Sequence, residues 1–568
     1  MKKERLLKQS AALLLVLSIT LCICINFTVL NESAADAIWV EETATNLLDI
    51  DLDGYYEIYN ATDLLAFSYL TRNHKQPALN VELAADIYFN EPLGFDRDTG
   101  LVAVYPRSYT PGQAPAFYVG CGIAGDTSGS DVTFDQTPAE EGYSYLPAQG
   151  GGYTKGEAYT LTKWLPIAYN TIGGYIGNFD GKGYKIHGLY MKNTSGLTFG
   201  LFDYVASGII ENVQVVDTVF LSSYGGGIVG RTNGNSLIRN CVFEGTLRVG
   251  AVGGGIVGSA NGVIEHCINK GSVIGYVEKN HSQIGGIAGR LSGSVRYCGN
   301  EGTVSAYMAV GGIVGWAHGR VIGCYNTGSV SGNARVGGII GENTGTHAVG
   351  CYSIGSVTGT SQVGGIVGTS QNAPSKHCYY LTGTASGGVD GADIAQRAEA
   401  RDAAAFARGE VAYLLQQGLS EVGSTVCWGQ ALTGEEKASY PVPGGPRVYY
   451  GYVCEVLQYT NNEKAGENGP THTYNNATCE SAAVCTACGK TITPAFGHKY
   501  DDTCDTECNA CGAVREPQHH SENADGKCDV CGERYTLSAA LITLIALGGA
   551  VTLGGGGFCL YRILKKKN

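Results

Sequence analysis

The composition of this 568-residue chain limits what it can be. Hydrophobic residues make up 44% of it, so the chain can bury sizeable cores and is not disordered throughout. Its 84 glycines are about twice the usual share and indicate a fold dense in turns. A formal net charge of −13, with only 38 lysines and arginines, argues against nucleic acid as a partner.

The first residues have the pattern of an export signal. Basic residues within residues 2–8 precede the apolar run AALLLVLSITLCICINFTVL, and small residues follow at Ala35 and Ala37. We therefore expect a signal peptide over residues 1–37. The alternative is an uncleaved N-terminal anchor, because the apolar run is nearly long enough to span a bilayer.

The next two segments differ in character. Residues 38–90 form the first of them and contain DGYYEIYNATDLLAFSYL. Residues 91–163 are rich in glycine, proline, serine and aromatic residues and predict a loop-rich insertion. Loops of this length are usually functional or disordered, and the sequence leaves both open.

The aromatic residues of the insertion are candidates for ligand contact. Tyrosine rings suit contact with glycans or proteins, because they combine an apolar face with a hydroxyl group. The candidate binding residues are Tyr105, Tyr109, Phe117, Tyr118, Tyr143 and Tyr145.

A glycine-rich phrase, such as GGIVGWAHGRVIGCYNTGSVSG, recurs six times within residues 225–384. Successive isoleucines of the phrase are separated by 28, 31, 26, 26 and 27 residues. Each unit holds three short apolar runs closed by Gly, Asn or Ser, which suit strands joined by tight turns. The period predicts an all-β fold, a right-handed parallel β-helix or β-solenoid with one coil per unit. The isoleucines are Ile228, Ile256, Ile287, Ile313, Ile339 and Ile366.

Stacked coils should place like residues in columns. We expect Val273, Val304, Val330 and Val357 to stack, and glycines to form corners with positive φ. Cysteines recur in the same register, and they could form disulfides, bind metal or remain free thiols. Parallel stacking holds their Cβ atoms slightly too far apart for disulfides, so we predict free buried thiols. These cysteines are Cys241, Cys267, Cys298, Cys324, Cys351 and Cys378.

The pattern GGIVGxxxGxVxxCYNxGSVSG resembles the GLUG repeat of bacterial cell-surface proteins. That repeat occurs in Gram-positive surface proteins, including the immunoglobulin A peptidase group, and the resemblance covers about residues 196 to 381. It implies a β-helical protein displayed on the cell surface. DGYYEIYNATDLLAFSYL, within residues 38–90, resembles the strand-plus-helix opening of such proteins, which implies an N-terminal cap over the open end of the coils. Residues 164–191 resemble their first coils, which we therefore place in residues 164–224. The chain lacks the HExxH motif with which such peptidases hold zinc. Acidic residues within 225–381 are few and scattered, so we expect no glycosidase chemistry and no enzyme activity.

Two further segments follow the repeats. Residues 385–465 predict a C-terminal cap module, in which an amphipathic helix over residues 398–417 and later strands plug the end of the coil stack. Residues 466–534 contain three variants of a His, Cys, Cys-x-x-Cys-Gly pattern, typical of zinc knuckles. An even number of cysteines in an exported chain also fits disulfides, and both readings stay open, with zinc favoured.

The predicted zinc ligands come from all three of these Cys/His modules. They are His472, Cys485, Cys488, His498, Cys504, Cys508, Cys511, Cys528 and Cys531, and Cys479 belongs to the same pattern.

Near its end, the chain carries 25 uncharged residues, 537–561, followed by a basic tail over residues 562–568. This pattern predicts a transmembrane helix with a cytoplasmic tail, and hence a single-pass protein at the cell surface. We expect a non-enzymatic adhesin that binds extracellular glycans or proteins. The alternatives are a surface-bound carbohydrate-active enzyme and a structural spacer without a ligand.

Overall fold

The computed structural model places the chain in two compact units. The first comprises Met1–Tyr450 and Tyr459–Glu463, and the second Gly451–Gln458 and Lys464–Asn568. The structure describes residues 51–73, 76–97, 100–110, 112–120, 142–148, 153–169, 173–276, 282–345, 348–371, 375–453, 456–463, 475–486, 489–501, 505, 507–515 and 527–530. The predicted signal peptide, residues 1–37, lies outside them.

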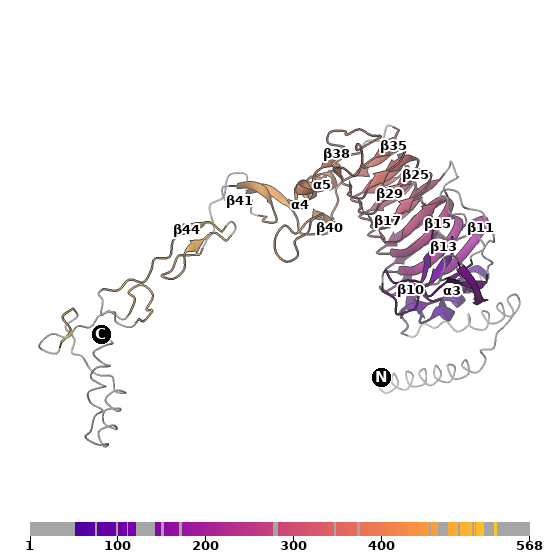
Figure 1. Cartoon of the computed structure of the whole chain (residues 1–568), viewed down its shortest axis with the longest axis horizontal. Coiled ribbons are helices and arrows are strands. Elements are labelled where there is room, and N and C mark those ends of the chain that lie inside the picture. The colour runs from indigo at the N-terminus through magenta and orange to yellow at the C-terminus, as the bar shows by residue number, and fades with distance from the viewer. Residues whose placement is uncertain are drawn as a thin grey trace, which may run out of the picture. The chain divides into compact units, whose positions relative to one another are not determined.

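The first unit is a parallel β-solenoid, as the repeat period predicts, built from two long sheets (Figure 1). The first sheet contains β1 (Tyr56–Ile58), β2 (Val81–Leu83), β9 (Phe179–Asp180), β12 (Phe202–Glu211), β14 (Val229–Arg239), β16 (Val257–Ala260), β21 (Ala288–Leu291), β26 (Val314–Ala317), β31 (Ile340–Asn343) and β36 (Val367–Ser370) in this order, with β17 (Val263–Glu265), β22 (Ser294–Arg296), β27 (Arg320–Ile322) and β32 (Ala348–Val349) beside them.

The second sheet pairs the remaining strands of each coil with their equivalents one coil away. Its strands are β3 (Ile87–Tyr88), β10 (Lys185–His187), β11 (Tyr190–Phe199), β13 (Gln214–Gly226), β15 (Val242–Gly254), β18 (Ile268–Asn269), β19 (Ser272–Gly275), β20 (Gln283–Gly285), β23 (Gly299–Asn300), β24 (Val304–Ser305), β25 (Met308–Gly311), β28 (Tyr325–Asn326), β29 (Val330–Ser331), β30 (Ala334–Gly337), β33 (Tyr352–Ser353), β34 (Val357–Thr358), β35 (Ser361–Gly364), β37 (Cys378–Leu381) and β38 (Ala398–Arg401).

Like residues stack in columns along the solenoid core, as predicted. The backbone N–H of Ile287 donates to the carbonyl of Ile313 at 2.9 Å, and that of Ile313 donates to Ile339 at 2.9 Å. The repeat isoleucines are all fully buried. Val304 pairs with Val330 in register, and Val330 with Val357. Each coil therefore buries the apolar face of the next.

A second column is polar and was not predicted. Asn269 donates from Nδ2 to Oδ1 of Asn300 at 2.6 Å, and Asn300 donates in the same way to Asn326 at 2.7 Å. Asn326 donates to the hydroxyl oxygen of Ser353 at 3.1 Å. All four side chains are fully buried. In a low-dielectric core, such a continuous ladder satisfies groups that would be costly to bury singly.

The glycines of the repeat serve two purposes, of which the left-handed corners were predicted and the close packing was not. A Cβ on Gly312 would lie 2.1 Å from the carbonyl oxygen of Gly338, and one on Gly286 would lie 2.1 Å from that of Gly312. These glycines do not have positive φ; they allow close backbone approach between coils. The predicted left-handed corners occur at Gly323 and Gly350, each with φ 61°, and residues other than glycine hold the equivalent corner in other coils.

The six repeat cysteines are buried free thiols, as predicted. The thiol of Cys267 lies 3.4 Å from the carbonyl oxygen of Glu265, and that of Cys351 lies 3.4 Å from the carbonyl oxygen of Val349. Burial raises the pKa of both thiols well above the usual value. They therefore behave as small apolar residues with a weak S–H donor.

Helix α3 (Ala61–Asn73) covers the N-terminal end of the solenoid, as predicted. Leu64 and Phe67 are fully buried in the solenoid core. The ring centroid of Phe67 lies 5.8 Å from that of Tyr175 and 6.1 Å from that of Phe179. The helix therefore protects the first coils, whose strand edge would otherwise be open.

The C-terminal module contains two helices where one was predicted over residues 398–417. Residues 398–401 form β38, and helices α4 (Ala403–Ala407) and α5 (Glu410–Glu421) follow. Gly409, with φ 86°, separates the helices because its backbone is left-handed. Gly418 lies within α5, where a Cβ would come 2.8 Å from Cβ of His377, so it permits close packing.

The first residues of this module cover part of the end of the coil stack, since β38 pairs with β37 of the last coil. Its helices and β39 (Trp428–Gly429) instead pack against the side of the coils, which corrects the prediction that the helix plugs the end. The ring centroid of Trp428, in β39, lies 5.3 Å from that of Tyr352. Its Nε1–H donates to the carbonyl of Gly350 at 2.7 Å. The stacked tyrosines Tyr325 and Tyr352 offer a lateral apolar surface, which the module buries. The strand β40 (Val442–Pro443) pairs with β39.

The segment expected to be loop-rich, residues 91–163, contains a five-stranded antiparallel sheet. Its strands in order are β4 (Leu93–Phe95), β5 (Val102–Val104), β6 (Phe117–Val119), β7 (Tyr143–Pro147) and β8 (Tyr153–Ala158). The strands are short and their connections long, so the alternating pattern is weak in the sequence.

The described part of the second unit has little regular structure. Strands β41 (Tyr449–Val453) and β42 (Val456–Thr460), whose residues are divided between the two units, pair with each other. Strand β43 (Ala483–Val484) pairs with β44 (Thr491–Thr493). The predicted transmembrane helix, residues 537–561, and the tail, residues 562–568, lie outside the described residues.

Within the described ranges, every helix is too short or too polar to cross a bilayer. Helix α3 has 13 residues and α5 has 12, whereas a span needs about 20. This finding contradicts the predicted location as a single-pass cell-surface protein, and we withdraw that location.

Candidate functional site

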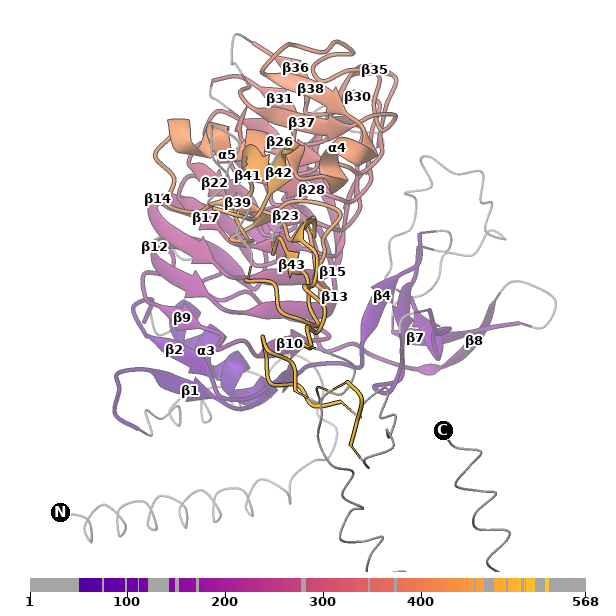
Figure 2. The ribbon, with the colours of Figure 1, turned by 90° about the vertical axis from the view of Figure 1, so that its left-hand side faces the viewer.

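The insertion sheet has one face packed on the coils. Phe117 and Val119 of β6 point to this face, where they join Val219 and Leu221 of the solenoid strand β13 in one apolar cluster. Because side chains alternate along a strand, Tyr118 between them points to the opposite face. Figure 2 shows the sheet beside the N-terminal coils.

The opposite face carries tyrosines. Tyr118 pairs with Tyr145 across β6 and β7, and the ring of Tyr118 meets that of Tyr153 edge-on at 5.2 Å. The ammonium group of Lys155 lies 3.5 Å from the ring centroid of Tyr143. We call these five residues the tyrosine face. It offers aromatic rings, hydroxyl groups and one cation on a single surface, a combination suited to stacking and hydrogen bonding with a ligand.

The other three predicted binding residues have different surroundings. Phe117 packs inward, with its ring 4.8 Å from that of Tyr159. Tyr105 stacks on Tyr109 at 4.8 Å. The hydroxyl group of Tyr109 donates to Oδ1 of Asp217 at 3.0 Å, and burial together with this carboxylate raises its pKa.

Asp217 joins the insertion to the coils through a polar contact that the sequence did not reveal. Its Oδ2 lies 2.8 Å from Nδ1 of His187, while its Oδ1 accepts the hydrogen bond from Tyr109. The ring of His187 stacks on that of Tyr88 at 4.5 Å. Asp217 has a φ of 51°, which is unusual for a residue other than glycine. The three polar groups therefore orient the insertion relative to the solenoid.

The second unit contains a cluster of four metal-ligating side chains, Cys479, His498, Cys508 and Cys511, whose ligand atoms lie within 4.8 Å of one another. The Sγ atoms of Cys479 and Cys508 are 3.7 Å apart. Sγ of Cys511 is 3.4 Å from Nδ1 of His498. Tetrahedral zinc with Zn–S bonds of about 2.3 Å places two sulfur atoms about 3.7 Å apart, whereas a disulfide needs about 2.05 Å. The donor set and its spacing therefore fit a zinc ion.

Backbone geometry positions these ligands. In the Cys508–Cys511 turn, the N–H of Gly512 donates to the carbonyl of Cys508 at 2.8 Å, and Gly512 has a φ of 71°. The N–H of Gly497 donates to the carbonyl of Cys479 at 2.9 Å, which brings the preceding module beside His498. The turn and this contact together bring Cys479, His498 and the Cys508–Cys511 turn to the same cluster.

A carboxylate contacts the imidazole of His498 on the side away from the cysteines and orients the ring. Its Nε2 lies 3.2 Å from Oε1 of Glu480, so Nδ1 faces the cysteines. A carboxylate on the second nitrogen is a common support for a metal-ligating histidine. It fixes both the ring orientation and the tautomer.

The thiol of Cys508 is disposed to ionise. Burial raises its pKa, but hydrogen bonds from the Ala510 N–H, His498 and the Lys499 N–H outweigh this and lower the pKa to about 6. A hydrogen bond with Cys511 raises the pKa of Cys479 to about 12. Thiolate is the form that binds metal, so the turn favours the ligating state of Cys508.

The predicted zinc ligands divide into three groups. The structure brings together His498, Cys508 and Cys511, and adds Cys479 from the preceding module. Cys485 and Cys528 are buried outside this cluster. The residues His472, Cys488, Cys504 and Cys531 lie outside the described residues.

The fold and these sites define a parallel β-solenoid that carries an antiparallel insertion and is followed by a Cys/His region. Comparison with protein families identifies the GLUG motif at residues 306–331, the coil that contains Ile313 and Cys324. This match confirms the resemblance drawn from the repeats.

Among solved structures, the chain is similar to the crystal structure of a "putative immunoglobulin A1 protease" from Bacteroides ovatus. The similarity covers 68% of this chain and 91% of that one, with 17% identity and a TM-score of 0.33. We draw no conclusion about activity from a similarity of this size. None of the curated proteins matches the sequence.

Proposed function

We propose that this chain is a non-enzymatic adhesin that binds a glycan or protein ligand through the tyrosine face of its insertion. The observation that carries the proposal is the gathering of Tyr118, Tyr143, Tyr145 and Tyr153 with Lys155 on the sheet face away from the coils. The opposite face already packs on the solenoid, so the tyrosine face is the one presented outward. The coils provide a rigid support, since their side chains interlock along the stack.

An array of immobilised glycans and extracellular-matrix proteins, probed with the full chain, tests this function. We expect Tyr118→Ala and Tyr143→Ala each to weaken binding of any hit about tenfold, because an aromatic contact contributes about 1 to 1.5 kcal/mol. Tyr224→Ala, which removes an exposed tyrosine from a solenoid strand, is the matched control and should bind normally. Equal binding by all variants would contradict the proposal.

Two alternatives give different results in the same experiment. A carbohydrate-active enzyme would release reducing sugar from the glycan that it binds, and a spacer would bind nothing on the array. Unchanged glycan after prolonged incubation with the full chain is the result that the adhesin proposal expects.

For the second unit, we propose that the cluster of Cys479, His498, Cys508 and Cys511 holds zinc as a structural ion. Four protein ligands close the coordination shell, as in structural rather than catalytic zinc sites. The described part of this region has little regular structure of its own, and a bound ion would tie its segments together. Elemental analysis of the purified full chain should find zinc, and its absence after purification with added zinc would contradict the proposal.

A further inference from the structure

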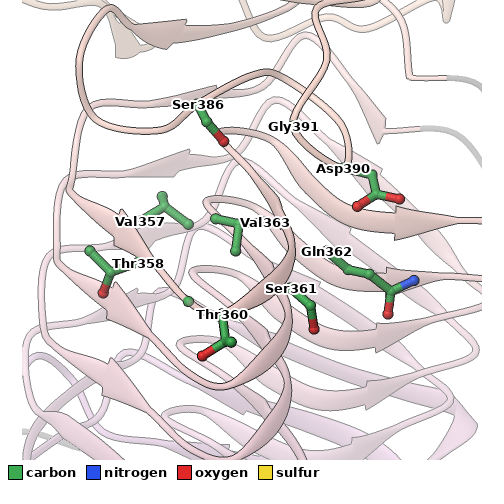
Figure 3. A pocket seen from close by; sticks show the side chains of 10 residues that line it. Val357, Thr358, Thr360, Ser361, Gln362, Val363, Ser386, Asp390 and Gly391 are labelled. Carbon is green, nitrogen blue, oxygen red and sulfur yellow. The ribbon is translucent and has the colours of Figure 1, made fainter.

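The last coil has an open pocket of about 420 Å³ at the corner between β34 and β35 (Figure 3). Thr358, Thr360 and Ser361 from this corner line one side, and Ser386 and Asp390 from the following loop line the other. The volume lies within the range of about 300 to 1,000 Å³ usual for ligand pockets.

The pocket exposes a backbone donor that earlier coils use for stacking. The N–H of Ala306 donates to the carbonyl of Ser331 at 3.1 Å, and one coil later the N–H of Gly332 donates to Thr358 at 3.0 Å. The equivalent donor of the last coil is the N–H of Gly359. Among the described residues, it has no partner.

The same corner exposes a backbone acceptor. The carbonyl of Tyr307 accepts hydrogen bonds from the N–H groups of Asn333 and Ala334, at 2.9 and 3.2 Å. One coil later, the carbonyl of Asn333 accepts from Thr360 and Ser361, at 2.9 and 3.0 Å. The equivalent carbonyl of the last coil belongs to Thr360, and no described residue donates to it.

The following loop covers this coil edge on either side of the pocket. The N–H of Gly391 donates to the carbonyl of Val363 at 2.7 Å, and the N–H of Val357 donates to the carbonyl of Thr384 at 2.8 Å. The free donor and acceptor thus lie in the pocket, between two positions that the loop covers. An uncovered strand edge is a site where another extended chain can pair.

The polar side chains of the pocket indicate the chemistry of its occupant. The described lining contains hydroxyl groups, the Gln362 amide and the carboxylate of Asp390, but neither an aromatic ring nor a cation. The lack of aromatic rings disfavours stacked sugars, and the lone carboxylate favours a cation. In the preceding coil Ala334 pairs with Ser361 and Val336 with Val363, which places Arg335 opposite Gln362. A further strand in the same register would bring its equivalent side chain beside the pocket, where a basic group would complement the carboxylate of Asp390.

We propose that this pocket binds an extended peptide that carries a basic side chain. The peptide pairs with the N–H of Gly359 and the carbonyl of Thr360, as a further coil would, and its basic side chain meets Asp390. This is strand addition to a sheet edge, in which backbone hydrogen bonds supply affinity and side-chain contacts supply specificity. The site is separate from the tyrosine face and does not depend on it.

A labelled peptide tests the proposal with the full chain. The probe is GSVSGNARVGG, the sequence of residues 328–338, which forms the equivalent corner one coil earlier. We expect its fluorescence anisotropy to rise on titration with the chain. Asp390→Asn should weaken binding about threefold, as expected for an exposed ion pair, and Ser386→Trp, which fills the pocket, should abolish it. Glu436→Gln, an exposed carboxylate away from the pocket, is the matched control.

Three results would overturn the inference. One is no binding of the probe; another is equal binding to the wild-type chain, Asp390→Asn and Ser386→Trp. The third is displacement of the probe by neutral saccharides, which would make the pocket a glycan site. Weaker binding of a peptide with glutamate in place of its arginine would support the proposed contact with Asp390.

Discussion

The solenoid and the Cys/His region solve the same problem, holding short extended segments in place, by different means. In the solenoid, Ile313 and Asn300 each contact an equivalent residue one coil away. A residue type therefore stabilises the fold because the same type recurs at the same position of the next coil. In the Cys/His region, Cys479 and Cys508 belong to different modules and meet only at one cluster. Stability in the first is spread over many contacts, and in the second it depends on one centre.

The difference teaches where mutations should act. A change in one coil removes a part of a long column, whereas a change in the cluster removes the contact that joins its modules. The first should therefore give graded effects, and the second an all-or-none effect within its unit.

Cys508→Ser should have the largest effect, because structural zinc contributes about 10 to 16 kcal/mol to small metal-dependent folds. We expect the variant to bind one zinc ion fewer per chain and the second unit to lose its slowly exchanging amides. Zinc analysis and hydrogen exchange measure both. Cys427→Ser, a thiol in the first unit that contacts the Gly445 carbonyl, is the control and should keep its zinc. Full zinc content in Cys508→Ser would contradict the claim that the Cys/His region depends on one zinc centre.

Ile313→Ala should lower the free energy of unfolding of the solenoid by about 3 kcal/mol, because Ile313 is fully buried and the column cannot close over the cavity. Urea unfolding of the full chain followed by circular dichroism measures the change. Ile394→Ala, at a position that is 37% exposed, should change the midpoint little. Similar midpoints for the two variants would show that the isoleucine column does not hold the coils.

Asn300→Ala should cost about 2 kcal/mol, less than the isoleucine change, because it leaves the Asn269 amide without its acceptor and Asn326 without a donor. The same urea experiment detects it, with the exposed Asn235→Ala as control. Asn326→Ser should cost less, since Ser353 already continues the ladder with a hydroxyl group. A stabilised Asn300→Ala variant would mean that the ladder serves specificity alone.

Arg239→Gln should have the smallest effect, at most about 1 kcal/mol, because exposed ion pairs contribute little. Arg239 lies 2.7 Å from Glu211 one coil away, and its side chain is 39% exposed. High salt should therefore lower the midpoint of the wild-type chain slightly more than that of the variant. A loss as large as that of Ile313→Ala would place the ion pair of Arg239 with Glu211 among the main supports of the coils.

The sequence predicted the solenoid because its period is local and repeats: the isoleucine, valine and cysteine columns follow from spacing alone. It did not predict the lateral position of the helices in the C-terminal module. That position depends on the contact of Trp428 with Tyr352, two residues that lie far apart in the sequence. It also assigned the close-packing role of Gly312 to a left-handed corner, since glycine composition does not distinguish the two uses.

The sequence predicted the residue types of the candidate sites but not how the structure arranges them. Cys-x-x-Cys-Gly turns marked Cys508 and Cys511 as ligands, but spacing cannot say that Cys479 comes from the module before. Aromatic composition marked the insertion, but strand alternation decides that Tyr118 points outward and Phe117 inward.

Hydrogen exchange of the full chain, before and after removal of zinc by a chelator, tests the contrast between the two regions most directly. We expect residues 475–486 and 507–515 to lose their protection on chelation, while the coils of residues 225–371 exchange at unchanged rates. Equal loss in both regions, or none in the Cys/His region, would contradict the account.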